Sequence, residues 1–286
     1  MSRCFFVSDI HGRADSYQKL FRTIEGEQPD AVFLGGDLGP MAWAAGPPLR
    51  PGAGNFISGY LVPHLVCLRN ELGRLYPRIF VILGNDDCRY EEASILSAAA
   101  SGLWEYIAGR RVEFGSHPLY GYPFVPPTPF LLKDWERYDV SRYVDPGCVS
   151  PEEGVRSVPV SEREKKYATM VEDLERLAAG RDLSQAIFLF HAPPYGTKLD
   201  VTFGGRMFEH VPLDIHLGSI AVRRFIESHQ PFLTLHGHVH EAAAISGSWR
   251  DRIGRTHCFT AAHDGPELAL VEFDLQKIDE AVRRII

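Results

Sequence analysis

Five short apolar runs in this sequence each end abruptly in side chains that can bind a metal ion. The polar residues at these ends are Asp9, His11, Asp37, Asn85, His191, His238 and His240. Carboxylate, amide and imidazole groups are hard to borderline ligands for divalent cations. Buried strands have the composition of these apolar runs, so five such runs ending in ligands indicate one site at the edge of a sheet.

The spacing of His238 and His240 also favours a shared site. Alternate residues of an extended segment face the same side, so we expect both imidazoles on one side of the chain. His236 lies on that side too, but it precedes the Gly-His-Val-His element, and we interpret it as a structural or supporting residue.

Helical patterns separate the predicted strands. Apolar residues at helical spacing predict helices over 17–24, 91–101, 161–180 and 219–228. Ser161 and Glu164 form a capping box at the start of the third helix, and Gly180 ends it. Strands that alternate with helices in this way predict an α/β architecture.

Two long stretches interrupt the alternation of strands and helices. Residues 40–59 are rich in Gly, Pro and Ala, and residues 117–159 are rich in Pro and aromatic side chains. Long loops of this kind often carry function. We interpret 117–159 as a lid or rim inserted over the site, with an irregular packed excursion that has no substrate role as the equal alternative.

Composition and charge narrow the possible classes of protein. The chain has 286 residues, 45% of them hydrophobic, and a formal net charge of -7. This composition is typical of a soluble globular protein, and the predicted ligands extend from Asp9 to His240, so we expect one domain over 1–286. The negative charge gives no indication of nucleic-acid binding. Five cysteines without a C-x-x-C pair argue against disulfides and a zinc knuckle.

No apolar run is long enough for a membrane helix, and the start of the chain is too short for a signal peptide. The expected location is therefore the cytoplasm. The sequence leaves the oligomeric state open.

The order of the motifs identifies a family resemblance. Asp9-x-His11, Gly36-Asp37, Gly84-Asn85, His191 and Gly237-His238-x-His240 occur in the order and at the approximate spacing of the calcineurin-like metallophosphoesterase superfamily. The resemblance covers nearly the whole chain. It implies a four-layer α-β-β-α sandwich and a phosphoesterase that acts on a small phosphate-ester substrate.

The resemblance also implies a role for each ligand. Asp37 would bridge two divalent ions. Asp9, His11 and His240 would complete the first site, and Asn85, His191 and His238 the second. Two cations about 3.5–4 Å apart can clamp a phosphoryl group and share an activated water, and a bridging hydroxide would attack phosphorus in line. These ligands suit Mn, Fe, Zn, Co or Ni, with Mn or Fe favoured.

The sequence departs from the common family pattern at two places. Asp86 occupies the position of the histidine that usually orients substrate and helps protonate the leaving oxygen, and Asp87 matches the following acidic residue. No arginine follows Asp37 where protein phosphatases of this superfamily carry one, so a Ser/Thr protein phosphatase is not expected. The chain looks most like a bacterial and archaeal branch of predicted phosphoesterases that often replaces this histidine.

The third motif leaves the leaving-group step open. Asp37, Asn85, His191 and Asp86 are the candidate catalytic residues, and Asp86 is either a general acid or a solvated turn residue. Nearby cations favour the charged carboxylate, whereas Asp87 favours the neutral acid; we expect the cations to dominate and Asp86 to stay ionised. Diesters with good leaving groups depend less on a proton donor, so we favour diester substrates.

Two other functions remain as alternatives. A binding or scaffold protein on the same fold is the first, although a scaffold has no need for an intact set of ligands. A phosphoesterase that acts on nucleic-acid ends is the second, and the net charge makes it the weaker alternative.

Overall fold

The centre of the molecule is a pair of six-stranded sheets with strand orders β14-β13-β1-β2-β3-β4 and β11-β12-β10-β7-β6-β5. The computed structural model describes residues 3–41, 56–205 and 207–286. The strands of the first sheet are β1 (Arg3–Val7), β2 (Ala31–Gly35), β3 (Arg78–Ile82), β4 (Glu105–Tyr106), β13 (Ala269–Asp274) and β14 (Val282–Ile285). Those of the second are β5 (Arg111–Phe114), β6 (His117–Tyr122), β7 (Ile187–Phe190), β10 (Leu233–His236), β11 (Arg250–Ile253) and β12 (Thr256–Thr260).

Both sheets are parallel where the site is built. β1, β2 and β3 pair in parallel in the first sheet, and β6, β7 and β10 pair in parallel in the second. The carboxyl ends of parallel strands meet at one edge of a sheet, so the polar residues that follow these strands are brought together.

The strands read as continuous apolar runs because both faces of each sheet are buried. Phe6, Phe33 and Phe80 of the first sheet pack with Leu189 and Leu235 of the second in one core between the sheets. The alternate residues of the same strands join a second core under the helices. Burial on both faces removes the usual alternation of apolar and polar residues.

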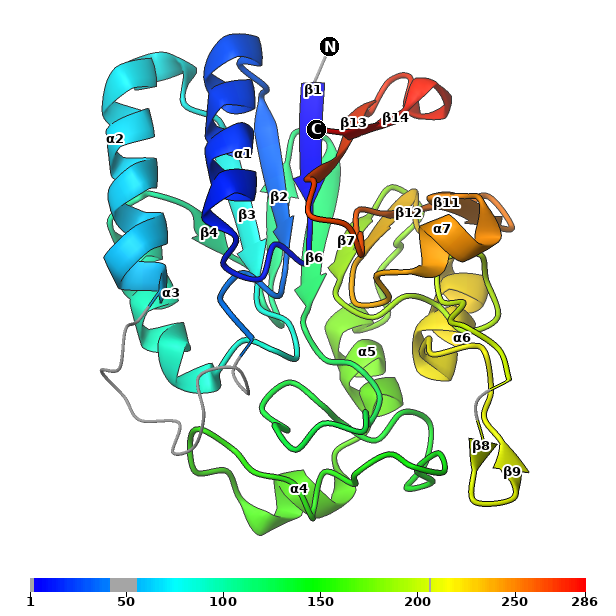
Figure 1. Cartoon of the computed structure of the whole chain (residues 1–286). Helices are drawn as coiled ribbons and strands as arrows, with labels where there is room; N and C mark the ends of the chain where they lie inside the picture. The colour runs from blue at the N-terminus through cyan, green and yellow to red at the C-terminus, as the bar shows by residue number, and fades with distance from the viewer. Residues whose placement is uncertain (1–2, 42–55, 206) are drawn as a thin grey trace.

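Helices cover the outer faces of the two sheets (Figure 1). Helices α1 (Ala14–Glu27), α2 (Val62–Leu72) and α3 (Glu92–Ala100) lie along the first sheet, and α5 (Met170–Ala178) and α6 (Ile220–His229) along the second. The remaining elements are α4 (Glu162–Tyr167), α7 (Ala242–Ser246) and a small hairpin of β8 (Met207–Phe208) and β9 (Val211–Pro212). The predicted four-layer α-β-β-α sandwich is confirmed. None of the helices in the described ranges is long and apolar enough to span a bilayer.

The helix predicted over 161–180 is wrong in its continuity. The chain forms two helices, α4 and α5, with Ala168 and Thr169 extended between them. The Thr169 side chain accepts a hydrogen bond from the Glu172 amide and caps α5, while the Met170 amide donates to the Tyr138 carbonyl. These two interactions replace the helical hydrogen bonds that the apolar periodicity predicts. At the start of α4, the Ser161 side chain accepts from the Glu164 amide, as the capping box requires.

The two long stretches differ from the prediction at their ends. Residues 42–55 of the stretch 40–59 lie outside the described residues, but Ile57–Leu61 form a π-helical turn that leads into α2. Helix α2 was not among the predicted helices. His117–Tyr122 form β6, a strand of the second sheet, so the irregular part of 117–159 begins at Pro123.

Candidate metal centre

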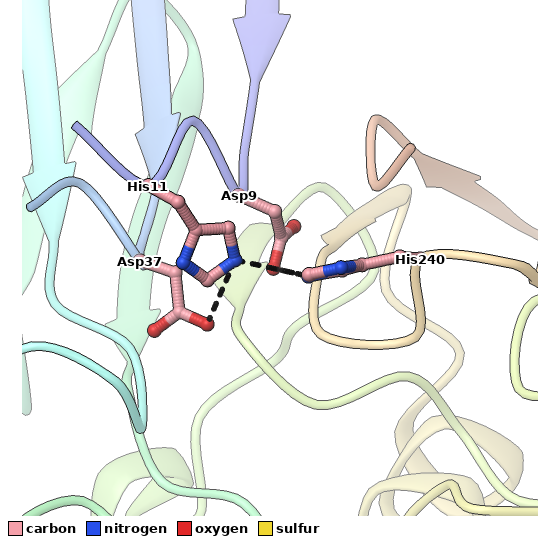
Figure 2. Close-up of side chains that lie close together, drawn as sticks. All are labelled: Asp9, His11, Asp37 and His240. Carbon is pink, nitrogen blue, oxygen red and sulfur yellow. Dashed lines mark hydrogen bonds and ion pairs between the residues drawn. The ribbon is translucent and has the colours of Figure 1, made fainter. Parts of the chain in front are cut away.

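Four of the seven predicted ligands form one tight cluster. Asp9, His11, Asp37 and His240 each offer a ligand atom, and these atoms all lie within 4.8 Å of one another. Figure 2 shows the side chains converging from the loops after β1 and β2 and from the His240 loop. The Nε2 atom of His11 lies 3.1 Å from Nε2 of His240 and 3.8 Å from Oδ2 of Asp37.

The other three predicted ligands lie close to one another, and His191 also contacts Asp37. Nε2 of His191 is 3.0 Å from Oδ1 of Asn85 and 3.2 Å from Oδ2 of Asp37. The ring centroids of His191 and His238 are 5.5 Å apart. Asp37 Oδ2 therefore lies within 4 Å of both the His11 and the His191 imidazole.

The backbone of the ligand loops is held in an uncommon conformation. Asp9, His11, Asp37 and His238 all have positive φ angles, between 50° and 74°. Residues other than glycine adopt this region only when the surrounding structure enforces it. Here the amides of Asp9 and His11 donate to carbonyls of the loop after β2 at 3.0 and 2.9 Å, which fastens two motif loops together. The positive φ of His238 also shows that the predicted extended alternation of His238 and His240 is wrong, because the chain turns between them.

Two glycines permit the close approach of these loops. A Cβ atom on Gly84 would lie 2.3 Å from Oδ1 of Asp37, and one on Gly237 would lie 2.2 Å from the Ser8 hydroxyl oxygen. Neither position has room for a side chain. The glycine in each of these two motifs therefore allows the loop of a neighbouring motif to pack directly against the backbone.

The polar atoms at the centre fit a cation. His191 Nδ1 faces the Gly35 carbonyl at 2.8 Å and donates to it, which directs Nε2 toward Asn85 Oδ1 and Asp37 Oδ2. Three acceptor atoms then converge at one place, which is an arrangement that suits a cation. Asp9 Oδ2 and His11 Nδ1 are also buried without a hydrogen-bond partner among the described residues. Buried polar atoms without a partner are rare and costly, and a bound ion would satisfy both of them.

Electrostatics point the same way. Burial opposes the charged imidazole, yet Asp37 and Asp9 raise the pKa of His191 to about 10. The negative charges of Asp37 and Asp9 thus favour a positive charge at His191, and in the metal-free protein a proton on the imidazole supplies it. Burial lowers the pKa of His238 to about 3, which keeps it in the neutral form that binds metals.

Asp86 lies beside the cluster. Its amide donates to Oδ1 of Asp37 at 2.8 Å, and its Oδ2 is 3.7 Å from Nδ1 of His11. Burial, Asp37 and Asp87 raise the pKa of Asp86 to about 8 in the metal-free protein. This direction is opposite to the one expected from the sequence, because the neighbouring carboxylates act here without the opposing cations. For the metal-loaded protein, an ionised Asp86 stays a prediction.

Sequence reasoning missed the role of Asp87. Its buried carboxylate accepts hydrogen bonds from the amides of Leu38, Gly39 and Gly84, each at 2.9 Å. Burial and Asp37 raise its pKa to about 7. Asp87 therefore joins the loop that carries Asp37 to the loop that carries Gly84 and Asn85. In the sequence, only the position of Asp87 shortly after Asn85 could have indicated this anchoring role.

Arg13 was missed as well. Its side chain donates to the carbonyls of Ile10 at 3.0 Å, Asp9 at 3.3 Å and Gly265. These contacts hold the loop that presents Asp9 and His11.

His236 has the structural role expected from the sequence. Its imidazole is buried, stacks on Phe190, and is hydrogen-bonded to the Ala192 carbonyl and the Thr234 hydroxyl.

The irregular part of 117–159 is fastened next to the third motif. The buried carboxylate of Asp134 accepts from the amides of Arg89 at 2.8 Å and Ser157 at 2.9 Å. Lys133 and Glu136 form a fully buried ion pair in the same segment, and Thr128 donates to Glu136. The segment is thus well anchored beside the residues that follow Asn85, while its action as a lid or rim stays a prediction.

Comparison with solved structures finds the same fold at low sequence identity. The protein TT1561 of Thermus thermophilus superposes with a TM-score of 0.57 and 14% identity over 99% of this chain and 98% of that one. A dimetal phosphatase from Danio rerio superposes with a TM-score of 0.52 and 13% identity over 99% of this chain and 95% of that one. A search of curated protein sequences gave no significant match.

Comparison with protein families gives a match over most of the chain. Residues 2–242 match the calcineurin-like phosphoesterase family. This range includes all seven predicted ligands and agrees with the resemblance identified from the motifs. The chain belongs to the calcineurin-like phosphoesterase family and is a phosphoesterase-type hydrolase with a candidate metal site.

Proposed function

We propose that this protein hydrolyses small phosphate diesters with the help of two divalent metal ions. The observation that carries the proposal is the position of Asp37. Its Oδ2 atom lies 3.8 Å from Nε2 of His11, which contacts His240, and 3.2 Å from Nε2 of His191, which contacts Asn85.

The residues that would hold the ions fall into two groups. Asp9, His11 and His240 would hold one ion, Asn85, His191 and His238 the other, and Asp37 both. When bound, the ions would supply positive charge for the phosphoryl oxygens and an activated water for attack on phosphorus. Mn or Fe remains our preferred metal, since imidazole, amide and carboxylate ligands suit both. We place this activity in the cytoplasm, as the sequence suggested.

The protein's own groups arrange this centre. Asp87 and Arg13 hold the loops in register, and the Gly35 carbonyl fixes the proton of His191 on Nδ1. Asp86, a half-buried side chain outside the ligand set, lies 3.7 Å from Nδ1 of His11, where it could meet an ester oxygen. The segment after Pro123, anchored through Asp134, would form a rim of the substrate pocket.

The preference for diesters rests on Asp86. With metals bound, the carboxylate is expected to be ionised and unable to donate a proton to the leaving oxygen. Esters with acidic leaving groups need no such proton. A diester also carries one negative charge fewer than a monoester, which reduces its repulsion from an ionised Asp86.

The test compares two chromogenic esters in metal-reconstituted protein. Bis(p-nitrophenyl) phosphate should turn over faster than p-nitrophenyl phosphate, and Asp37→Asn should abolish both activities. If the protein binds metals but hydrolyses neither ester with any divalent ion, the scaffold alternative replaces the catalytic one. Faster turnover of the monoester would overturn the diester preference alone.

A further inference from the structure

A polar cavity lies outside the metal centre. It has a volume of about 470 Å³ and is bordered by α5, the turn before β5, the end of β6 and the start of α3. Its lining includes five arginines: Arg89, Arg111, Arg137, Arg176 and Arg181. None of the seven predicted metal ligands lines it.

Positive charge exceeds negative charge in this cavity. The lining carboxylates are Glu92 and Asp173, so five guanidinium groups face two carboxylates. Glu113 and Glu164 pair with lining arginines from outside the lining and still leave the arginines in excess. The formal charge of the whole chain is -7, so this concentration of arginine runs against the charge of the molecule.

The carboxylates around the cavity already accept hydrogen bonds from neighbouring side chains. Asp173 accepts from the Tyr122 hydroxyl at 3.0 Å, from Arg137 at 2.7 Å and from Arg176 at 3.2 Å. No carboxylate within the described ranges pairs with Arg181, whose side chain meets only the Leu177 carbonyl at 3.4 Å. The arginines therefore retain donors for a further acceptor.

Two of the guanidinium groups are held in place by aromatic rings. Arg89 lies 5.3 Å above the Trp135 ring and Arg137 lies 4.0 Å above the Phe124 ring. Nη1 of Arg89 and Nε of Arg137 are buried without a hydrogen-bond partner among the described residues. Arginines positioned in this way lose little freedom when an anion binds.

We propose that this cavity binds a small, multiply charged phosphate-containing ligand at a site separate from the metal centre. The planar fork of arginine matches the oxygens of phosphate, and several forks in one cavity match a ligand with more than one phosphoryl group. Cavities that hold small ligands typically measure roughly 300–1,000 Å³, so the volume is adequate. The proposal does not depend on the catalytic function proposed above.

The test uses methylenebisphosphonate, whose P–C–P bond resists hydrolysis, in isothermal titration calorimetry. An Asp37→Asn background removes binding at the metal centre, so the remaining binding reports the cavity. In this background, Arg111→Gln with Arg181→Gln should weaken binding about tenfold or more, since hydrogen bonds between charged groups are lost. The matched control changes Arg110 and Arg163, two exposed arginines outside the cavity, to Gln and removes the same charge.

The control pair should bind as tightly as the parent. If the cavity pair and the control pair weaken binding equally, the loss is explained by net charge alone and the proposal is overturned. Binding that is lost with Asp37→Asn alone, or no binding to the wild type at millimolar concentration, would also overturn it. Arg111→Lys with Arg181→Lys keeps the charge but removes the fork, and it should weaken binding several-fold even if the Gln pair folds poorly. Unchanged binding in the Lys pair would contradict recognition by the guanidinium fork.

Discussion

The metal centre and the arginine cavity are both concentrations of charge in a mostly apolar molecule, but they are built in opposite ways. In the metal centre, acceptor atoms converge from loops that follow strands of the two sheets. In the cavity, donors converge from long side chains on helix α5, a helical turn, strand β5 and two loops. The first arrangement calls for cations and the second for anions.

The difference lies in what holds each group. Asp9, His11 and Asp37 have short side chains, so the backbone must bring them together, at the cost of positive φ angles. The arginines reach across several ångströms and are steadied by rings and carboxylates instead. We therefore expect the metal centre to be sensitive to backbone-anchoring residues and the cavity to individual side-chain contacts.

The largest effect should come from Asp37→Asn. Loss of the shared carboxylate weakens both proposed ion sites, and we expect turnover to fall roughly a thousandfold or more. His240→Ala should weaken mainly one site and cost roughly ten- to a hundredfold. Metal occupancy and turnover measured for both variants check this. Equal losses in the two variants would count against a bridging role.

Asp87→Ala should show how far the centre depends on backbone anchors. The change leaves the amides of Leu38, Gly39 and Gly84 buried without their acceptor, at a cost of about 2–4 kcal/mol in the free energy of unfolding. Urea denaturation measures this value, and metal titration should show weaker binding.

Asp87→Asn serves as the control because it keeps one carbonyl oxygen, so it should lose less stability than Asp87→Ala. If the alanine variant retains wild-type stability and metal affinity, the anchoring role is wrong.

Arg137→Gln should lower the stability of the cavity region without affecting the metal centre. It removes ion pairs to Asp173 and Glu164 and the contact over Phe124, and we expect a loss of about 1–2 kcal/mol in stability. The metal content should stay at the wild-type value. A fall in metal content comparable to that of Asp87→Ala would show that the two regions are not independent.

The smallest effect should come from Asp86→Asn on an activated diester. An ionised Asp86 gives no proton to the leaving oxygen, so turnover of bis(p-nitrophenyl) phosphate should change only a few-fold. A methyl p-nitrophenyl diester and an alkyl diester with a poor leaving group complete the series. If only the poor leaving group suffers, by about a hundredfold or more, then Asp86 is the proton donor.

The fold and the proximity of the candidate ligands were largely predictable from the sequence because they depend on backbone topology. Apolar runs such as Phe5 to Val7 indicate strands buried on both faces, and parallel strands must end at the same edge. The sequence therefore identified which residues meet, including Asp37 and His191. It could not give the path between His238 and His240, since the turn there follows from the contact of the His238 amide with Asp9.

Features set by tertiary partners escaped prediction. The apolar periodicity of 161–180 runs through Thr169 without interruption. The contact of the Met170 amide with the Tyr138 carbonyl and the cap formed by the Thr169 side chain separate α4 from α5. Pro63 makes the start of α2 resemble a loop, although proline is tolerated in the first turn of a helix. No pattern in the sequence predicts the arginine cavity, because its arginines come from separate segments with no regular spacing between them.

The most direct test of the account is the metal content of the purified protein after mild reconstitution with Mn, Fe, Zn, Co or Ni. Elemental analysis should give about two ions per chain in the wild type and far fewer in Asp37→Asn. A wild-type protein that binds no ion under any of these conditions, while remaining folded by circular dichroism, would contradict the account at its centre.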